Sequence, residues 1–205
     1  PELIQAYGYE YDLLSQSSVI TTVSQINRAD NEKRICVLKS GTFSDVALAS
    51  EHKLDLSSHL PRSEYLGLLN EKFKGRDEIF IGTTGNTARE MYRYMPDTRN
   101  FYMAGNMGGA LSLGLGAAKG GKKVVVCGGD AEFVMHLGGL TTAARYRHEV
   151  DLSYILFDNE SNKSTGGQRT YQDHVDYVGV ANSSDFGTEF DTIDDAETFE
   201  VAMTR

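Results

Sequence analysis

Short apolar runs alternate with segments of helical spacing along most of this chain. The apolar runs predict strands at residues 35–38, 78–83, 124–127 and 152–157, with a weaker strand near Phe190. Helices are expected at residues 19–28, 62–73, 85–94, 107–119, 131–146, near 174–181 and from Asp195 onward. Because short apolar strands separated by helices favour parallel pairing with both faces covered, we expect an α/β fold. Its centre would be a doubly wound, mostly parallel sheet with helices on both faces.

The same pattern divides the chain into a small first block and a larger second block. Residues 1–45 hold one predicted helix and one predicted strand. Residues 46–61 are mixed and polar and end at Pro61, so we expect them to form a linker. Residues 62–205 are the expected main domain, and because the last predicted element is a helix, this domain is expected to lack its last strand.

Composition narrows the classes of protein to consider. The 205 residues carry a net charge of −9 and a pI near 5.0, which argues against nucleic acid or an anionic membrane as a partner. No apolar run approaches the roughly 20 residues of a membrane span, and residues 1–10 show no secretion signal. Cys36 and Cys127 lie in apolar runs, so we expect two buried free thiols in a reducing cytoplasm.

Glycine is unevenly distributed along the chain. Eleven of the 21 glycines lie between Gly105 and Gly139. Clustered glycine indicates tight turns or close approach of the backbone to another group, which is either a ligand or a packed helix.

A carboxylate follows the strand expected at residues 124–127. The chain continues there as Gly-Gly-Asp-Ala-Glu, residues 128–132, into a predicted helix. The N–H groups at a helix start attract phosphate, and a carboxylate beside them would require a cation between the two negative groups. Asp130 is therefore either a ligand in a Mg²⁺-bridged diphosphate site or an ordinary N-cap.

A second predicted strand also ends in side-chain oxygens, since residues 158–161 read Asp-Asn-Glu-Ser. Asn159 stands 29 positions after Asp130, which is room for one helix and one strand. Ligands of open α/β sheets bind at the carboxyl ends of the strands, so neighbouring strands would bring both side chains to one place. Two such strand ends favour Mg²⁺, which prefers oxygen ligands.

The third candidate is a turn, Ala-Gly-Asn-Met-Gly-Gly at residues 104–109, before a helix of small residues. Its glycine spacing does not fit the dinucleotide fingerprint, and no preceding strand ends in an acidic residue that would bind ribose. A nicotinamide-binding domain is therefore a remote alternative. The turn offers a helix tip that another molecule can approach closely.

Together these three segments resemble the diphosphate-binding domain of thiamin-diphosphate-dependent enzymes. The family pattern Gly-Asp-Gly, followed later by a pair ending in Asn, appears at residues 129–131 and 158–159, with Ala131 and Asp158 as departures. The resemblance implies that Asp130, Asn159 and the backbone carbonyl of Ser161 hold Mg²⁺.

The same resemblance implies further contacts with thiamin diphosphate. The turn would bind the aminopyrimidine through the backbone of Gly105 and Met107, and the Met107 side chain would wedge the cofactor into its bent shape. The remaining cofactor-binding residues implied are Gly85, Gly129, Asp130, Ala131, Asn159, Ser161 and Thr165.

Residues 83–90, 100–103 and 164–168 resemble one branch of this family, the phosphonopyruvate decarboxylases. The sequence Ser-Thr-Gly-Gly-Gln soon after the metal-binding Asn is the most specific signature. Sulfopyruvate decarboxylases are similar over the same segments, so the substrate stays open between the two acids. The resemblance covers about residues 75–205, and residues 1–45 look like the C-terminal tail of a pyrimidine-binding domain.

The implied reaction converts phosphonopyruvate to phosphonoacetaldehyde and CO₂, and the cofactor accepts the electron pair as CO₂ leaves. It would belong to phosphonate and antibiotic biosynthesis. Four polar side chains near the strand ends are candidates for holding the substrate anion, with ordinary surface groups as the alternative: Arg89, Lys163, Ser164 and Arg169.

The glutamate that activates the cofactor lies in the pyrimidine-binding domain of this family, and no residue here matches it. We therefore expect the glutamate from a partner subunit or an upstream segment, in a homo- or hetero-oligomer, and no activity from this chain alone. A different class of protein, a non-catalytic cofactor-binding or scaffolding subunit, would be indicated by Ala131 and Glu132 in the diphosphate turn. His136 is expected to be a packed or surface histidine rather than a base.

Overall fold

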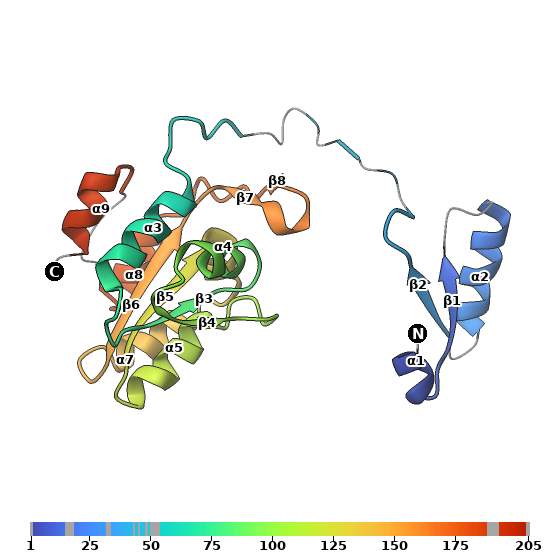
Figure 1. The fold of residues 1–205 in the computed structure, drawn as a ribbon, viewed down its shortest axis with the longest axis horizontal. Coiled ribbons are helices and arrows are strands. Elements are labelled where there is room, and N and C mark those ends of the chain that lie inside the picture. The colour runs from blue at the N-terminus through green and yellow to red at the C-terminus, as the bar shows by residue number, and fades with distance from the viewer. Residues whose placement is uncertain are drawn as a thin grey trace. The chain divides into compact units, whose positions relative to one another are not determined.

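A computed structural model describes residues 2–14, 19–31, 34–42, 44, 46–47, 49, 54–187 and 193–203. The chain forms two compact units, Pro1–Ala47 and Leu48–Arg205 (Figure 1). The weak strand expected near Phe190 lies outside the described residues. Among the helices of the described part, none has both the length and the apolar character to cross a bilayer.

The first unit pairs two parallel strands with two helices. Its elements are α1 (Glu2–Ala6), β1 (Glu10–Leu14), α2 (Val19–Asn31) and β2 (Arg34–Leu38). The predictions of the helix that became α2 and the strand that became β2 are confirmed. β1 was not predicted, because Glu10 and Asp12 interrupt its apolar pattern. The guanidinium of Arg34 on β2 lies 3.3 Å from the Asp12 carboxylate across the pair.

The expectation that β2 is a buried strand is wrong within this unit. Ile35 and Leu38 are 38% and 51% exposed, and Cys36 is half-buried. A two-stranded sheet with so few helices has too little covering surface to bury both faces. Cys127 is fully buried as expected, and burial raises the pKa of its thiol to about 12. Both cysteines are free.

The second unit is built on a four-stranded parallel sheet. Its order is β4 (Arg99–Tyr102), β3 (Ile79–Gly82), β5 (Lys123–Gly129) and β6 (Asp151–Phe157). The three strands predicted from apolar runs are confirmed, and β4 is an edge strand that the apolar pattern did not predict. β5 and β6 are neighbours in the sheet, which is the condition under which their carboxyl ends lie close together.

Helices cover both faces of this sheet, as predicted (Figure 1). On one face lie α3 (Arg62–Phe73), α4 (Asn86–Tyr94) and α9 (Ala196–Ala202), which share a core with Phe80 and Cys127. On the other face lie α5 (Ala110–Lys119) and, against it, α7 (Gly139–Arg145). Alternate residues of β5 serve the two cores, because successive side chains of a strand point to opposite faces.

Two expected helix boundaries near the glycine-rich region are wrong. Residues 131–146 do not form one helix but two, α6 (Asp130–Met135) and α7. The break between them covers residues 136–138 and ends within the Gly138-Gly139 pair. Glycine is a poor helix former and tolerates the break. α5 starts at Ala110, not at Met107, so the turn at residues 105–109 stays outside the helix. The helix expected near 174–181 is α8 (Tyr177–Ser183), and the one expected from Asp195 is α9.

Candidate functional site

Three strand ends meet at one edge of the sheet. β5 lies between β3 and β6, with Gly82 opposite Cys127 and Gly129 opposite Phe157 in the parallel register. The segments that leave these strands therefore start side by side: residues 83–85 after β3, Asp130 after β5 and residues 158–161 after β6. This is the edge where open α/β sheets bind ligands.

Asp130 is a buried carboxylate in the first turn of α6. It is 4% exposed, and its Oδ2 accepts a hydrogen bond of 3.0 Å from the Thr170 hydroxyl. Burial raises the pKa of Asp130, and the charge of Asp158 raises it further, while bonds from the Ala131 N–H and from Thr170 act in the opposite direction. The N-cap of α6 is Gly129 and no side chain caps it, so the N-cap interpretation of Asp130 is wrong.

The surroundings of Asp130 fit a divalent cation. Within the described ranges, the ion pairs do not include Asp130, so a buried carboxylate lacks the countercharge that would offset its desolvation. The described residues contain no group of three His, Cys, Asp or Glu arranged for a metal. Mg²⁺ does not need one, since it is usually held by one or two carboxylates together with phosphate oxygens and water.

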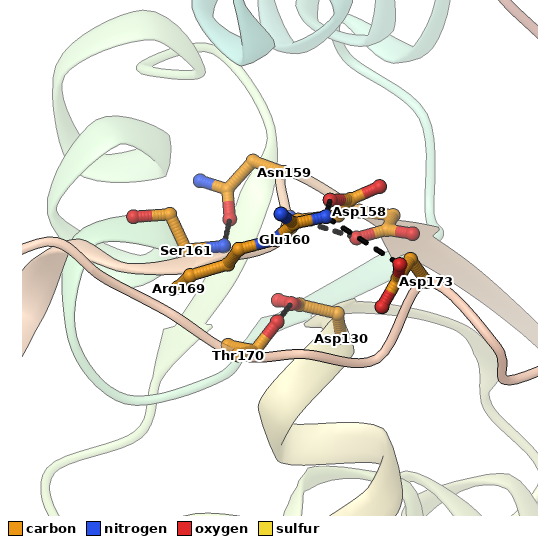
Figure 2. A network of polar contacts seen from close by, with 8 residues as sticks. All are labelled: Asp130, Asp158, Asn159, Glu160, Ser161, Arg169, Thr170 and Asp173. Atoms are coloured by element: carbon orange, nitrogen blue, oxygen red, sulfur yellow. Dashed lines mark hydrogen bonds and ion pairs between the residues drawn. The ribbon is translucent and has the colours of Figure 1, made fainter. Parts of the chain in front are cut away.

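Asn159 and Ser161 lie in the segment after β6. The Asn159 side-chain oxygen accepts a bond of 3.1 Å from the Ser161 backbone N–H, which fixes this tight turn. The Asp158 side chain does the same for the N–H of Glu160 at 2.9 Å. These turns bring the amide of Asn159 and the backbone of Ser161 to the carboxyl end of β6, next to the β5 end that carries Asp130 (Figure 2).

The segment after Glu160 forms a short hairpin. It consists of β7 (Ser161–Asn162), the 3₁₀ helix η2 (Lys163–Thr165) and β8 (Gln168–Arg169). The backbone N–H of Thr170 donates to the Glu160 carbonyl at 2.9 Å, while its hydroxyl reaches Asp130. Thr170 therefore links the base of the hairpin to the carboxylate at the end of β5 (Figure 2).

Arg169 is engaged by two carboxylates of the same segment. Its guanidinium lies 3.3 Å from Glu160 and 3.5 Å from Asp173, as Figure 2 shows. These ion pairs offset the positive charge of the Arg169 guanidinium, so a substrate anion would meet little net charge there. Lys163 in η2 is exposed, and so is Arg89 on α4, whose Nη1 donates to the Asn86 side chain at 3.2 Å.

The turn at residues 105–109 is anchored at both ends. The Gly105 N–H donates to the Thr84 hydroxyl at 3.1 Å, directly after β3. The Gly108 carbonyl lies 2.9 Å from Nδ1 of His136, and a Cβ on Gly108 would be 2.8 Å from the His136 Cβ. Glycine at 108 is required by this close approach and by its φ of 92°. Met107 between the anchors is half-buried.

Gly85 and Ser164 come together from distant parts of the sequence. Gly85 is the N-cap of α4 with a φ of 94°, and a Cβ placed on it would lie 3.6 Å from the Ser164 Cβ. The loop with Ser164 and Thr165 thus approaches the start of α4. Its polar groups bond mostly within the loop: Ser164 donates to Asn162 at 2.8 Å, and Gln168 donates to Thr165 at 2.7 Å.

Four residues that make contacts in this region were not among the expected site residues: Thr84, Glu132, His136 and Thr170. Each acts on a residue that is distant in sequence or through a backbone group, so no local motif marks it. Ala131 lies inside α6, where alanine is a favourable helix residue.

Two known proteins are similar in sequence to about half of this chain. The chain is 43% identical over 111 residues to sulfopyruvate decarboxylase subunit beta of Methanothermobacter thermautotrophicus, which covers 54% of this chain and 60% of that one. It is 40% identical over 107 residues to phosphonopyruvate decarboxylase of Streptomyces viridochromogenes, which covers 52% of this chain and 27% of the relative. The chain thus matches between about a quarter and three fifths of the length of these relatives.

The fold is shared with solved structures of low sequence identity. Benzoylformate decarboxylase from Polynucleobacter necessarius aligns over 85% of this chain and 33% of its own, with a TM-score of 0.57 and 16% identity. Residues 81–205 match the family described as thiamine pyrophosphate enzyme, C-terminal TPP binding domain. That stretch holds the three strand ends described above, and it is more than half of the chain. The chain belongs to the thiamine pyrophosphate enzyme family and carries its C-terminal TPP binding domain.

Proposed function

We propose that this chain forms the diphosphate-binding part of a decarboxylase that uses thiamin diphosphate and Mg²⁺. The observation that carries the proposal is the buried Asp130, which has a hydroxyl partner but no described countercharge and stands beside the turns of Asn159 and Ser161. Asp130, Asn159 and the Ser161 carbonyl would hold the metal. The remaining cofactor contacts would come from Gly85, Gly105, Met107, Gly129, Ala131 and Thr165.

The reaction proposed first is decarboxylation of phosphonopyruvate to phosphonoacetaldehyde. Thiamin diphosphate, when bound, supplies the electron sink for the loss of CO₂. The chain's own task is to bind and orient an acid that carries two negative groups. Three side chains are proposed to bind the phosphonate: Lys163, Arg89 and Ser164. They belong to η2 and to the start of α4, which approach each other. The 40% identity to a phosphonopyruvate decarboxylase supports this choice.

Sulfopyruvate is the second candidate, and the ion pairs of Arg169 favour it. With Glu160 and Asp173 on its guanidinium, Arg169 brings little net charge to the site. A sulfonate carries one negative charge where a phosphonate carries up to two, so it needs less positive charge in the protein. The 43% identity to a sulfopyruvate decarboxylase beta subunit points the same way.

We also propose that the active site is composite. The glutamate that activates the cofactor would come from a pyrimidine-binding domain, either in a partner subunit or in an upstream segment. The similar protein of Methanothermobacter thermautotrophicus is itself a subunit beta, which supports a separate partner chain. Residues 1–205 alone should release no CO₂ from either acid.

The test is CO₂ release from phosphonopyruvate and from sulfopyruvate, with thiamin diphosphate and Mg²⁺, by this chain together with its partner or upstream segment. Faster release from one acid assigns the substrate. Cofactor binding without release from either acid would move the proposal to another 2-oxo acid. Absence of cofactor binding would favour a non-catalytic scaffolding subunit.

Replacing Thr170 with valine should weaken Mg²⁺ binding in the presence of thiamin diphosphate by roughly 10- to 100-fold, the usual effect of removing a group that orients a metal ligand. Thr170→Ser keeps the hydroxyl that donates to Asp130 and should bind Mg²⁺ nearly as the unaltered protein does. Titration of Mg²⁺ by calorimetry measures both. Thr142→Val on the exposed side of α7 is the control, and equal Mg²⁺ affinity in the two valine variants would contradict the role of Thr170.

Lys163→Ala should raise the KM for the acid substrate about tenfold or more, since a hydrogen bond to a charged group contributes about 1.5–3 kcal/mol. The rate at saturation should change little, because the side chain would bind the anionic end and not the reacting carbon. Lys122→Ala, at an exposed lysine just before β5 and therefore at the opposite edge of the sheet, is the control. Steady-state kinetics would refute this role if both variants had the KM of the unaltered protein.

A further inference from the structure

Glu132 is a buried acidic side chain in α6 that the proposed cofactor contacts do not use. It is 3% exposed, and its Oε2 accepts a hydrogen bond of 2.5 Å from the Tyr154 hydroxyl on β6. The backbone N–H of Ala110, the first residue of α5, and the side chain of Thr83 lie near the same carboxyl group. The Glu132 side chain therefore turns inward, toward β6 and the start of α5.

A buried carboxyl is costly unless hydrogen bonds satisfy it, so its partners are informative. Here one partner is Tyr154 on β6, and the start of α5 lies nearby, where the 105–109 turn enters that helix. Burial raises the pKa of Glu132, while the Tyr154 hydroxyl, the Ala110 N–H and the Thr83 side chain act in the opposite direction. The carboxyl group thus joins the sheet to the end of the candidate aminopyrimidine turn.

We propose that Glu132 is a positioning residue, which holds the 105–109 turn in the geometry that binds the aminopyrimidine of thiamin diphosphate. This inference rests on the proposed function, because it concerns the same cofactor. The Glu132 carboxyl group lies beside Ala110 at the helix side of the turn, and the hydrogen bond between Gly105 and Thr84 fixes the strand side.

Close packing around Glu132 supports this role. A Cβ on Gly128 would lie 2.7 Å from the Glu132 Oε2, and a Cβ on Gly108 would lie 3.5 Å from the Glu132 carbonyl. A cavity of about 10 Å³ beside Glu132, His136 and Gly108 has room for about one water molecule. The contacts with Gly128 and Tyr154 confine the carboxyl group on the side of the sheet, so we expect its loss to loosen the packing next to the turn.

His136 adds a second link from the segment just after α6. Its Nδ1 lies 2.9 Å from the Gly108 carbonyl, one turn of chain beyond Glu132. Two groups from one short stretch of sequence thus hold two successive parts of the turn. Asp130, at the start of the same helix, is the proposed metal ligand. The helix would therefore set the spacing between the diphosphate end and the pyrimidine end of the cofactor.

The test compares the binding of two ligands in the full protein with its partner or upstream segment. Thiamin diphosphate reaches both ends of the proposed site, whereas inorganic pyrophosphate with Mg²⁺ reaches only the diphosphate end. Calorimetry measures both affinities in Glu132→Ala, Glu132→Gln and Tyr154→Phe. Glu149→Ala, which removes a surface carboxylate paired with Lys119 at 2.7 Å, is the control.

Glu132→Ala should weaken thiamin diphosphate binding roughly 10- to 100-fold and change pyrophosphate binding by less than about threefold. Glu132→Gln should restore most of the affinity, since its amide oxygen still accepts a hydrogen bond and the Tyr154 hydroxyl can pair with either end of the amide. Tyr154→Phe removes the hydrogen bond from this hydroxyl and should show a smaller loss with the same selectivity.

An unchanged affinity for thiamin diphosphate in Glu132→Ala would overturn the inference and leave the proposed function intact. An equal loss for both ligands would also overturn it, because it would show general damage to the domain. If Glu132→Ala does not fold, Tyr154→Phe decides by the same comparison. If the unaltered protein binds no thiamin diphosphate, the proposed function fails and the inference fails with it.

Discussion

Replacing Asp130 with asparagine should lower the rate of CO₂ release by about a thousandfold at millimolar or lower Mg²⁺. The reason is the loss of the only charged side chain among the three proposed metal ligands. Charge stabilisation by a bound metal contributes several kcal/mol, and each 1.36 kcal/mol corresponds to a factor of ten in rate. The rate should recover in part at high Mg²⁺, because the asparagine oxygen is a weaker ligand that keeps the same position.

The folded state should respond to Asp130→Asn in the opposite direction. Burial disfavours the charged form of Asp130, so its ionisation destabilises the metal-free fold at neutral pH. A neutral amide avoids that cost, and the midpoint of thermal unfolding without metal should stay equal or rise.

Asp151→Asn is the control for both measurements. Asp151 is a surface carboxylate at the amino end of β6, 3.9 Å from Lys123. A rate for Asp130→Asn equal to that of Asp151→Asn, at limiting Mg²⁺, would refute the proposed metal site.

The sequence predicted the sheet well because its strands are plain apolar runs. Residues 124–127 are mostly buried and residues 152–157 are mostly half-buried, and a parallel sheet with helices on either side is the fold that covers such apolar runs. The edge strand β4 was not predicted because its sequence is not a continuous apolar run. Its Phe101 and Tyr102 side chains are 50% and 36% exposed.

Asp130 and Asn159 could be proposed as metal ligands from sequence because both lie at strand ends, whereas Ser161 was implied only by the family resemblance. Asp130 and Asn159 needed only the assumption that β5 and β6 are neighbours, which the pairing of these strands confirms. Thr170 could not be found in this way. It reaches Asp130 across 40 positions because the β7–β8 hairpin folds back, and no spacing rule predicts that return.

The position of Glu132 in the sequence does not indicate which groups its side chain contacts. In sequence it stands two positions after Asp130, so it looked like a charge in the diphosphate turn. Two positions along a helix rotate a side chain by more than half a turn, so the two carboxylates point to different surroundings. Asp130 bonds to the hairpin, and Glu132 bonds to Tyr154.

Replacing Gly128 with alanine should destabilise the Leu48–Arg205 unit by about 3 kcal/mol, at the upper end of the usual cost of overpacking a core. A Cβ at this position would overlap the Tyr154 hydroxyl and lie 2.7 Å from the Glu132 Oε2. Glu132 is buried and Tyr154 is half-buried, so neither group can move freely into solvent. For a unit of this size, such a loss lowers the midpoint of thermal unfolding by about 6–12 °C.

Gly116→Ala is the matched control, with the opposite sign expected. Gly116 lies on the exposed side of α5, and nothing stands within 4 Å of the Cβ it would gain. Alanine is a better helix former than glycine, so this variant should be more stable by about 0.5–1 kcal/mol. If Gly128→Ala melted at or above the temperature of Gly116→Ala, the tight contact between Gly128, Tyr154 and Glu132 would be wrong. The link from Glu132 to the 105–109 turn would then lose its structural basis, because both depend on the same packing.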